Sequence, residues 1–285
     1  MIPPIQEIID ALTATYNHGQ RLLLLFDYDG TLTPIVSHPR LAGLHPETRR
    51  ILKNLACRPR IAIGIISGRE IDDLKSMVGL RNIYYAGTSG LELNLCGTQV
   101  THPQAGRMAM LLAILREHLN KILKMFPGAW FENKQLGLTV HYREVQQDHI
   151  PNIKSWVEQI ASPFLDKLDL QDGPMAVEIT PKLGWNKATA VQLILEHLGK
   201  ENVLTLYAGD APNDVAAIEY VSSIGGICIG IGPDTSQHVQ FHLTDQAAFM
   251  AFIASLDAVI PKNMHGNSQL NRHCPDIHKT CEKLL

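Results

Sequence analysis

The sequence predicts an α/β fold in which a doubly wound, parallel sheet forms the core and an α+β domain is inserted as a cap. Three observations lead to this prediction. Short apolar runs recur along the chain and end in Gly, Ser or Asp, which is typical of strands covered on both faces. Segments with apolar residues at helical spacing separate these runs. In the middle of the chain, a stretch of about 80 residues breaks the alternation, as an inserted domain would.

The core elements alternate along the chain. Apolar side chains from Ile5 to Tyr16 predict an opening amphipathic helix. The predicted core strands are 21–26, 60–66, 82–87, 203–209 and 225–232, and the predicted core helices are 46–57, 70–78, 186–198 and 213–221. In such a Rossmann-like arrangement, the carboxyl ends of the strands line a ligand crevice.

The inserted stretch has helices and strands of its own. We expect a helix at 105–126, a hairpin within 129–144, a helix near 149–162 and strands around 167–170 and 174–180. The predicted domains are 1–102 and 183–260 for the two parts of the core, 103–182 for the cap and 261–285 for a polar, flexible tail. Zinc ligation in this tail is a weaker alternative, because the spacing is not that of a standard zinc site for His273, Cys274, His278 and Cys281.

The composition is typical of a protein that acts on a small molecule. The formal net charge is -3, with 25 basic and 28 acidic residues, so neither nucleic acid nor a membrane surface is an expected partner. The first residues carry no early positive charge and no cleavage pattern, which argues against a signal peptide. Five cysteines without a CxxC pair suit a reducing compartment. We therefore expect a cytoplasmic monomer whose partner is a small soluble molecule.

Two aspartates follow the first apolar run, in "LLLLFDYDGTLTPI" at 22–35. The run is long enough for one buried strand and too short for a membrane span, which places Asp27 and Asp29 at the rim of the core. A carboxylate at a strand end can attack phosphorus and form an aspartyl-phosphate, and Asp27 is the candidate. Asp29 lies two residues further along. In extended geometry it points to the same side and suits a general acid and base.

Residues with complementary chemistry follow later strands. The segment "YAGDAPNDVAAIEY" supplies Asp210 and Asp214, which would help to hold the Mg²⁺ that offsets repulsion between a carboxylate and a phosphate dianion. The segment "IISGRE" places Ser67 and the backbone of Gly68 at a helix N-terminus, which favours phosphate. Lys187, in "GWNKATAV", adds the positive charge that a phosphate requires.

Four blocks in order, "DYDGT", "ISGR", Lys187 and "GDAPND", resemble the motifs of the haloacid dehalogenase superfamily of phosphatases. The extended first block "FDYDGTLTPIVSHP" is similar to the trehalose-6-phosphate phosphatase family. So are the segments "YAGTSGLEL", "FENKQLGLTVHYR" and "AVEITPKLGWNKATAV". The resemblance extends from about residue 20 to 255. It implies the same α/β core with a cap.

The resemblance also implies roles for the matched core residues. Asp27 would be the nucleophile and a Mg²⁺ ligand. Asp29 would be the general acid and base, and a ligand through its backbone carbonyl. Ser67 and Lys187 would hold the transferring phosphoryl group, with the backbone of Gly68 beside them. The resemblance places three further residues: Arg69, which would order the phosphate loop, and Asp210 and Asp214 in the metal site.

In the cap, the resemblance implies that Glu132, Lys134 and Glu178 face the sugar. The glutamates could accept hydrogen bonds from sugar hydroxyls and the lysine could donate one. This set favours a neutral sugar with one phosphate over the substrate of a phosphohexomutase, whose second phosphate would favour a cluster of arginines. The same three residues alternate with apolar neighbours, so they could equally form the solvated face of a sheet.

The leading functional prediction is a Mg²⁺-dependent sugar-phosphate phosphatase that hydrolyses trehalose 6-phosphate through an aspartyl-phosphate. The alternatives are a phosphatase for a glucosylglycerate-type or sucrose-type phosphate, a phosphohexomutase, or a catalytically idle phosphatase-like binding module. Two departures from the family pattern bear on the substrate. Ser89 stands where family members often have histidine, and Ala211 and Val215 stand where they often have more acid.

Overall fold

An eight-stranded sheet forms the core of the protein, seen in a computed structural model that describes residues 5–36, 38–173, 175–233 and 239–261. Its strands lie in the order β12-β11-β10-β1-β2-β3-β4-β5. Neighbours from β12 to β3 pair in parallel, and β4 and β5 add an antiparallel edge. The bounds are β1 (Arg21–Phe26), β2 (Ile61–Ile66), β3 (Tyr84–Gly87), β4 (Glu92–Leu95), β5 (Thr98–Thr101), β10 (Val203–Gly209), β11 (Ile227–Ile231) and β12 (Phe241–Leu243).

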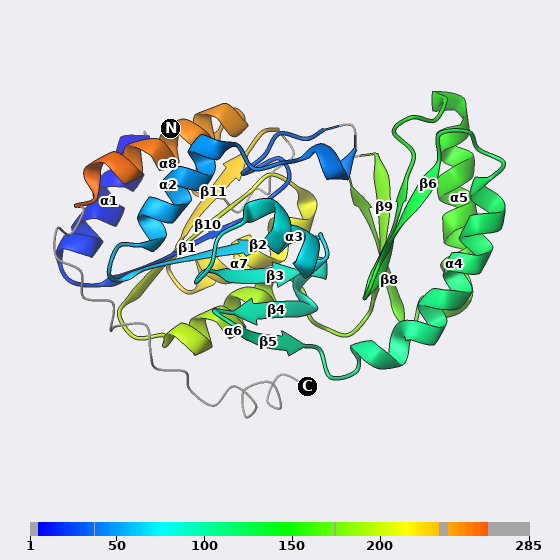
Figure 1. The fold of residues 1–285 in the computed structure, drawn as a ribbon, viewed down its shortest axis with the longest axis horizontal. Coiled ribbons are helices and arrows are strands. Elements are labelled where there is room, and N and C mark those ends of the chain that lie inside the picture. Colours follow the sequence, from blue (N-terminus) through cyan, green and yellow to red (C-terminus); the bar gives the residue numbers. More distant parts are fainter. Residues whose placement is uncertain (1–4, 37, 174, 234–238, 262–285) are drawn as a thin grey trace.

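Helices cover both faces of this sheet (Figure 1). One face packs against α1 (Ile5–Asn17), α2 (Pro46–Ala56), α3 (Ile71–Val78) and α8 (Gln246–Val259). The other face packs against α6 (Lys187–Leu198) and α7 (Val215–Ser223). The predicted doubly wound α/β core is therefore confirmed. Because helices occupy the two faces, the carboxyl ends of the strands are the place for a ligand.

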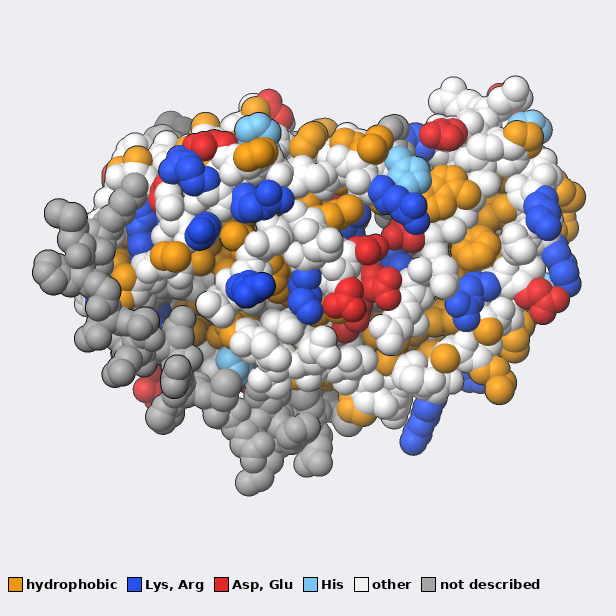
Figure 2. Space-filling view, viewed as in Figure 1, with side chains coloured by type: hydrophobic (Ala, Val, Ile, Leu, Met, Phe, Trp, Pro, Cys, Tyr) orange, Lys and Arg blue, Asp and Glu red, His pale blue; other side chains and the backbone are white. Residues whose placement is uncertain are grey.

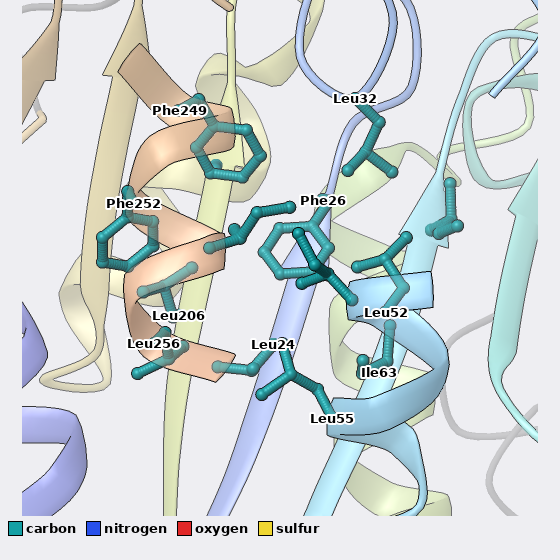
Figure 3. Packing of buried hydrophobic residues seen from close by; sticks show 14 of the residues in the cluster. Leu24, Phe26, Leu32, Leu52, Leu55, Ile63, Leu206, Phe249, Phe252 and Leu256 are labelled. Carbon is teal, nitrogen blue, oxygen red and sulfur yellow. The ribbon is translucent and has the colours of Figure 1, made fainter. Parts of the chain in front are cut away.

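The strand β1 lies between β10 and β2 and contributes side chains to both faces. Leu22, Leu24 and Phe26 belong to one hydrophobic cluster, whereas Leu23 and Leu25 belong to the opposite one. All five side chains are at most 1% exposed. Figure 3 shows Leu24 and Phe26 between apolar residues of α8 and α2. Burial on both faces explains why this strand has no polar position between Arg21 and Asp27.

A second, four-stranded sheet lies in the predicted cap segment, in the order β6-β7-β9-β8. All its pairs are antiparallel. Its strands are β6 (Trp130–Lys134), β7 (Gly137–His141), β8 (Leu168–Gly173) and β9 (Ala176–Pro181). The helices α4 (Ala109–Leu123) and α5 (Ile150–Ala161) cover its outer face, and its other face looks toward the core (Figure 1). This arrangement supports the proposal that residues 103–182 form an inserted cap domain. The limits of that domain stay a prediction.

Four core elements have no counterpart in the sequence prediction. The strands β4 and β5 form a short hairpin at the sheet edge, and β12 has only three residues, which is too few for a clear alternation pattern. The helix α8 carries a legible signal, because Phe249, Phe252 and Leu256 recur at helical spacing after the N-cap Asp245. The zinc alternative lies outside the described residues, with His273, Cys274, His278 and Cys281.

Replacing Leu24 with Ala tests the importance of β1. The side chain is fully buried, so we expect the free energy of unfolding to fall by about 2–5 kcal/mol. Leu41 is a matched control because it is 67% exposed, and Leu41→Ala should change the free energy of unfolding by at most about 0.5 kcal/mol. Urea denaturation followed by circular dichroism measures both values. Equal losses in the two variants would contradict a core centred on β1.

Candidate active site

Functional side chains gather at the carboxyl ends of β1, β2 and β10. Phe26 at the end of β1 pairs with Ile65 of β2 and with Ala208 of β10, so the three strands end nearly level. Asp27 follows β1, Ser67 follows β2 and Asp210 follows β10. Figure 2 shows acidic side chains gathered where the core meets the cap, beside basic and histidine side chains.

Lys187 joins two of the predicted carboxylates. Its Nζ donates to Asp27 Oδ1 at 2.6 Å, to Asp214 Oδ1 at 2.6 Å and to Asn213 Oδ1 at 3.2 Å. The residue is the first of α6, where the side chain of Asn186 caps the helix by accepting from the backbone of Ala188 and Thr189. Lys187 is 1% exposed, so its ammonium group is fully desolvated among these partners.

Asp214 is surrounded by donors from the protein. Its Oδ1 accepts from Lys187 and from the hydroxyl of Tyr207 at 2.5 Å, and its Oδ2 accepts from the backbone N–H of Ala211 at 3.2 Å. The residue is fully buried. Because both oxygens are engaged by protein donors, the geometry fits Asp214 better as a group that holds Lys187 than as a direct metal ligand.

The carboxylates carry more negative charge than the one ammonium group offsets. Oxygens of Asp27, Asp210 and Asp214 lie within 4.8 Å of one another. Burial raises the pKa of Asp27 well above its usual value, with Lys187 opposing this rise and Asp214 adding to it. Burial and Asp214 raise the pKa of Asp210 to about 7. Burial alone would lower the pKa of Lys187, but Asp214 and Asp27 hold it above its usual value. This surplus of charge on oxygen ligands fits a group that could hold a metal ion.

Gly30 lets the first motif approach Asp210. Its φ is +89°, and a Cβ at this position would lie 1.9 Å from Asp210 Oδ2. No other residue type fits this approach without a shift of the backbone or of Asp210. The hydroxyl of Thr31 also reaches Asp210, with Oγ1 at 3.4 Å from Oδ1. The turn after β1 therefore brings the first and last motifs together.

Arg69 forms a bidentate ion pair with Asp29. Its Nε donates to Oδ2 at 2.7 Å and its Nη2 to Oδ1 at 2.6 Å, while Nη2 also donates to the carbonyl of Pro39 at 2.9 Å. Such a fork fixes the orientation of a carboxylate more firmly than a single bond. The predicted acid and base is thus tied to the loop that follows β2, which also contains Ser67 and Gly68.

The phosphate loop predicted at 67–69 is held by backbone contacts. The N–H of Ser67 donates to Ala86 O at 2.9 Å, and the Oγ of Ser67 accepts from the N–H of Arg69 at 3.2 Å. Ser67 is 1% exposed. Its hydroxyl is therefore positioned by its own loop at the end of β2.

The three predicted cap residues share the face of the second sheet that looks toward the core. Glu132 pairs in register with Thr139, which pairs with Glu178, and Lys134 lies two residues after Glu132 on the same strand. Lys134 Nζ donates to Glu178 Oε1 and to the carbonyl of Gly68, both at 2.7 Å. The cap sheet thus contacts the predicted phosphate loop directly.

Glu132 has a partner within the cap. Its Oε2 lies 3.3 Å from His141 Nε2. Burial alone would raise the pKa of Glu132, but the hydrogen bond to His141 and the charges of Lys134 and Arg69 hold it below its usual value. The ring of His141 stacks on Trp130, which stacks in turn on His38 of the core, with centroids 4.2 and 4.9 Å apart. These ring contacts form a second link between cap and core.

Sequence reasoning did not find several residues of this network. Tyr207 lies inside an apolar strand and looks like a core residue, so only the register of β10 reveals its bond to Asp214. Asn213 lies within a quoted motif, and its contact with Lys187 depends on the placement of α6.

Ser89, which departs from the family pattern, lies next to the site, because its N–H donates to the carbonyl of Ser67 at 3.0 Å.

Replacing Lys187 with Met removes the cation that compensates the buried carboxylates. In metal-free buffer, we expect the free energy of unfolding to fall by about 3–5 kcal/mol near pH 8. The pKa of Asp210 is about 7 in the folded protein and about 3.9 when unfolded, so its buried charge costs stability as pH rises between these values. Without Lys187 the cost of ionising the buried Asp210 grows. At pH 5 Asp210 is protonated in the folded protein, so the fall in the free energy of unfolding caused by Lys187→Met should be smaller there.

Urea denaturation at the two pH values measures this difference. The control is Lys200→Met, because Lys200 pairs at the surface with Glu196 at 2.9 Å and should contribute at most about 0.5 kcal/mol. A loss in Lys187→Met that does not depend on pH would contradict the compensation of buried carboxylates.

Within the described residues, none of the helices has the length and apolar character needed to span a bilayer.

The sequence model of the trehalose-phosphatase family matches residues 25–245. The chain is 32% identical over 256 residues to Probable trehalose-phosphate phosphatase J of Arabidopsis thaliana, covering 84% of this chain and 68% of the plant protein. It is 33% identical to Trehalose-phosphate phosphatase of Mycobacterium tuberculosis, covering 71% of this chain and 52% of the mycobacterial protein, or about half of its length.

A solved structure shows the same fold. The C-terminal domain of trehalose-6-phosphate phosphatase from C. albicans superposes with a TM-score of 0.78 at 24% identity, covering 88% of this chain and 97% of that domain. Together with the family match over the four motifs, this confirms the predicted resemblance to the haloacid dehalogenase superfamily. The chain belongs to the trehalose-phosphatase family and is a phosphoric monoester hydrolase of that type.

Proposed function

We propose that the protein hydrolyses trehalose 6-phosphate to trehalose and phosphate through an aspartyl-phosphate on Asp27, with Mg²⁺ as cofactor. The family match and the names of its relatives support the substrate. One observation carries the mechanism: the carboxylate of Asp27 is paired with Lys187 at 2.6 Å, at the strand ends that the cap sheet faces. A cytoplasmic location and a monomeric state stay predictions.

In the first step, an oxygen of Asp27 bonds to phosphorus and the bond from phosphorus to the sugar oxygen breaks. Lys187 holds Oδ1 of Asp27 and so orients the attacking carboxylate. Arg69 donates to both oxygens of Asp29 and so sets the orientation of this side chain. To act as the acid, Asp29 takes up a proton with one of these two bonds open, and then gives that proton to the departing oxygen.

In the second step, water attacks phosphorus and the acyl-phosphate bond breaks, which restores the Asp27 carboxylate and releases phosphate. Asp29, now ionised, accepts the proton of the attacking water. The hydroxyl of Ser67 and the backbone of Gly68 stand at the end of β2, level with Asp27, and would donate to the phosphoryl oxygens. Lys187 would add positive charge to them.

The charge surplus at Asp27, Asp210 and Asp214 supports a divalent cation at this site. Asp27, Asp210 and the backbone carbonyl of Asp29 would hold Mg²⁺, with Asp214 beside it. When bound, Mg²⁺ supplies positive charge that reduces the repulsion between the carboxylates and the phosphate dianion. Asp214 would act through Lys187, because protein donors already engage both of its oxygens.

The cap residues support selection of a neutral sugar. Glu132, Lys134 and Glu178 lie on the face that looks toward the core, and Lys134 is only 6% exposed. They therefore do not form a freely solvated face. Because Lys134 and Glu178 already pair with each other, sugar hydroxyls would replace or share bonds that exist without substrate. Carboxylates that accept from hydroxyls give polar selectivity without a second phosphate site.

A substrate panel tests the proposed function. We expect phosphate release with Mg²⁺ from trehalose 6-phosphate at the highest kcat/KM, ahead of sucrose 6-phosphate, glucose 6-phosphate and glucosylglycerate phosphate. Preference for another member of the panel would instead identify that sugar phosphate as the substrate.

Asp27→Asn should abolish release while circular dichroism shows the native fold, since burial already favours the neutral side chain at this position. Full activity in Asp27→Asn would remove Asp27 as nucleophile.

Thermal unfolding tests the metal site without an activity assay. Mg²⁺ at 100 times its Kd should stabilise the wild type by about 2.7 kcal/mol and raise Tm by a few degrees. Asp210→Asn should lose most of that increase, because it removes one carboxylate of the cluster. Asp172→Asn is the control, since Asp172 pairs with Lys154 at the surface of the cap. An equal rise in Tm in all three proteins would contradict a site at Asp210.

A further inference from the structure

A left-handed turn at Thr88, Ser89 and Gly90 lies beside the predicted phosphate loop. The φ angles of these residues are +44°, +53° and +103°. The N–H of Thr88 donates to Arg69 O at 2.7 Å, and the N–H of Ser89 donates to Ser67 O at 3.0 Å. Both bonds reach carbonyls of the segment 67–69. The turn therefore supports the phosphate loop at both of its ends.

The other side of the same turn contacts the start of α6. A Cβ at Gly90 would lie 2.3 Å from the carbonyl oxygen of Asn186 and 3.3 Å from the backbone nitrogen of Lys187. The turn thus lies between the loop with Ser67 and the residue that carries the buried ammonium group. It is therefore in contact with both of the segments that would bind phosphate.

The side chain of Glu92 holds this turn. Its Oε1 accepts from the hydroxyl of Thr88 at 2.8 Å and from the N–H of Ile71, the first residue of α3, at 3.1 Å. Glu92 is 5% exposed. A buried carboxylate is costly unless donors satisfy it, and both of these donors belong to the segments that flank the phosphate loop. Glu92 therefore connects the end of that loop to the turn.

The turn needs such support. Left-handed backbone is unfavourable for residues with a Cβ and most of all for β-branched ones such as Thr88. Such a residue persists only when its surroundings hold it. The bond from the Thr88 hydroxyl to Glu92 is one restraint that the surroundings supply.

We propose that Glu92 is a positioning residue that sets the distance between the phosphate loop and Lys187. The proposal rests on the proposed function only in taking Ser67, Gly68 and Lys187 as the phosphate subsite. Glu92 does not touch the substrate. Without it, the turn would relax, the carbonyls of Ser67 and Arg69 would lose fixed partners, and the two phosphate-binding groups would no longer be held at one spacing.

The experiment measures the Ki of inorganic phosphate as a competitive inhibitor, with whichever member of the substrate panel the wild type hydrolyses. Glu92→Ala and Thr88→Val should each raise this Ki, by about tenfold or more for Glu92→Ala. Glu92→Gln keeps an acceptor oxygen of the same reach, and its Ki should stay within about twofold of wild type. Thr88→Val keeps the proposal testable if Glu92→Ala does not fold.

A matched control separates positioning from general loss of stability. Asp257 is another buried carboxylate, 5% exposed and paired with Arg58 at 2.8 Å. Because Asp257 lies on α8 and outside the phosphate subsite, Asp257→Ala should lower Tm and leave the Ki of phosphate unchanged. An unchanged Ki in both Glu92→Ala and Thr88→Val would overturn the proposal. So would an equal rise in Asp257→Ala, or a failure of Glu92→Gln to preserve the Ki.

The outcome is distinguishable from failure of the proposed function. If the wild type prefers a monoester other than trehalose 6-phosphate, the substrate assignment fails. The Ki of inorganic phosphate still tests Glu92, since this probe contains no sugar.

Discussion

The site depends on one buried ammonium group. Lys187 lies 2.6 Å from an oxygen of Asp27 and of Asp214, and all three residues are at most 5% exposed. Carboxylates this close repel strongly where the effective dielectric constant is low. The core can therefore place Asp27 directly after β1 and Asp214 in the short helix after β10 only because a cation lies between them. The position of that cation depends in turn on the capping of α6 by Asn186.

Glycine positions let the backbone enclose these charges. A Cβ on Gly209 would lie 2.4 Å from Asp214 Cγ, and one on Gly30 would lie 1.9 Å from Asp210 Oδ2. A larger residue at either place would push a carboxylate away from the cluster. The charges are thus surrounded by backbone and by each other rather than by bulk water. Such exclusion of water strengthens the electrostatic interactions within the site.

Much of the core site could be predicted because each motif follows an apolar strand. Asp27, Ser67 and Asp210 follow β1, β2 and β10, and parallel strands bring their carboxyl ends to one edge. The pairing of Asp29 with Arg69 could not be predicted, because it depends on the path of two loops that are distant in the sequence. The same holds for Tyr207, whose hydroxyl is invisible in an apolar pattern.

The cap illustrates the same limit. Alternation of polar and apolar residues indicated which residues of β6 and β9 share a face, but it could not tell whether that face met water or the core. The contact between Lys134 and the Gly68 carbonyl at 2.7 Å decides this. It depends on how the second sheet is placed over the first, and strand periodicity contains no information about that placement.

Trapping the covalent intermediate tests the central claim most directly. The protein is quenched with acid during turnover, reduced with borohydride, which converts an aspartyl-phosphate to homoserine, and digested for mass spectrometry. The account predicts homoserine at Asp27 in the quenched sample and unmodified Asp27 in a sample without substrate. Homoserine at another aspartate, or none at Asp27 under conditions that reduce an acyl-phosphate standard, would contradict it.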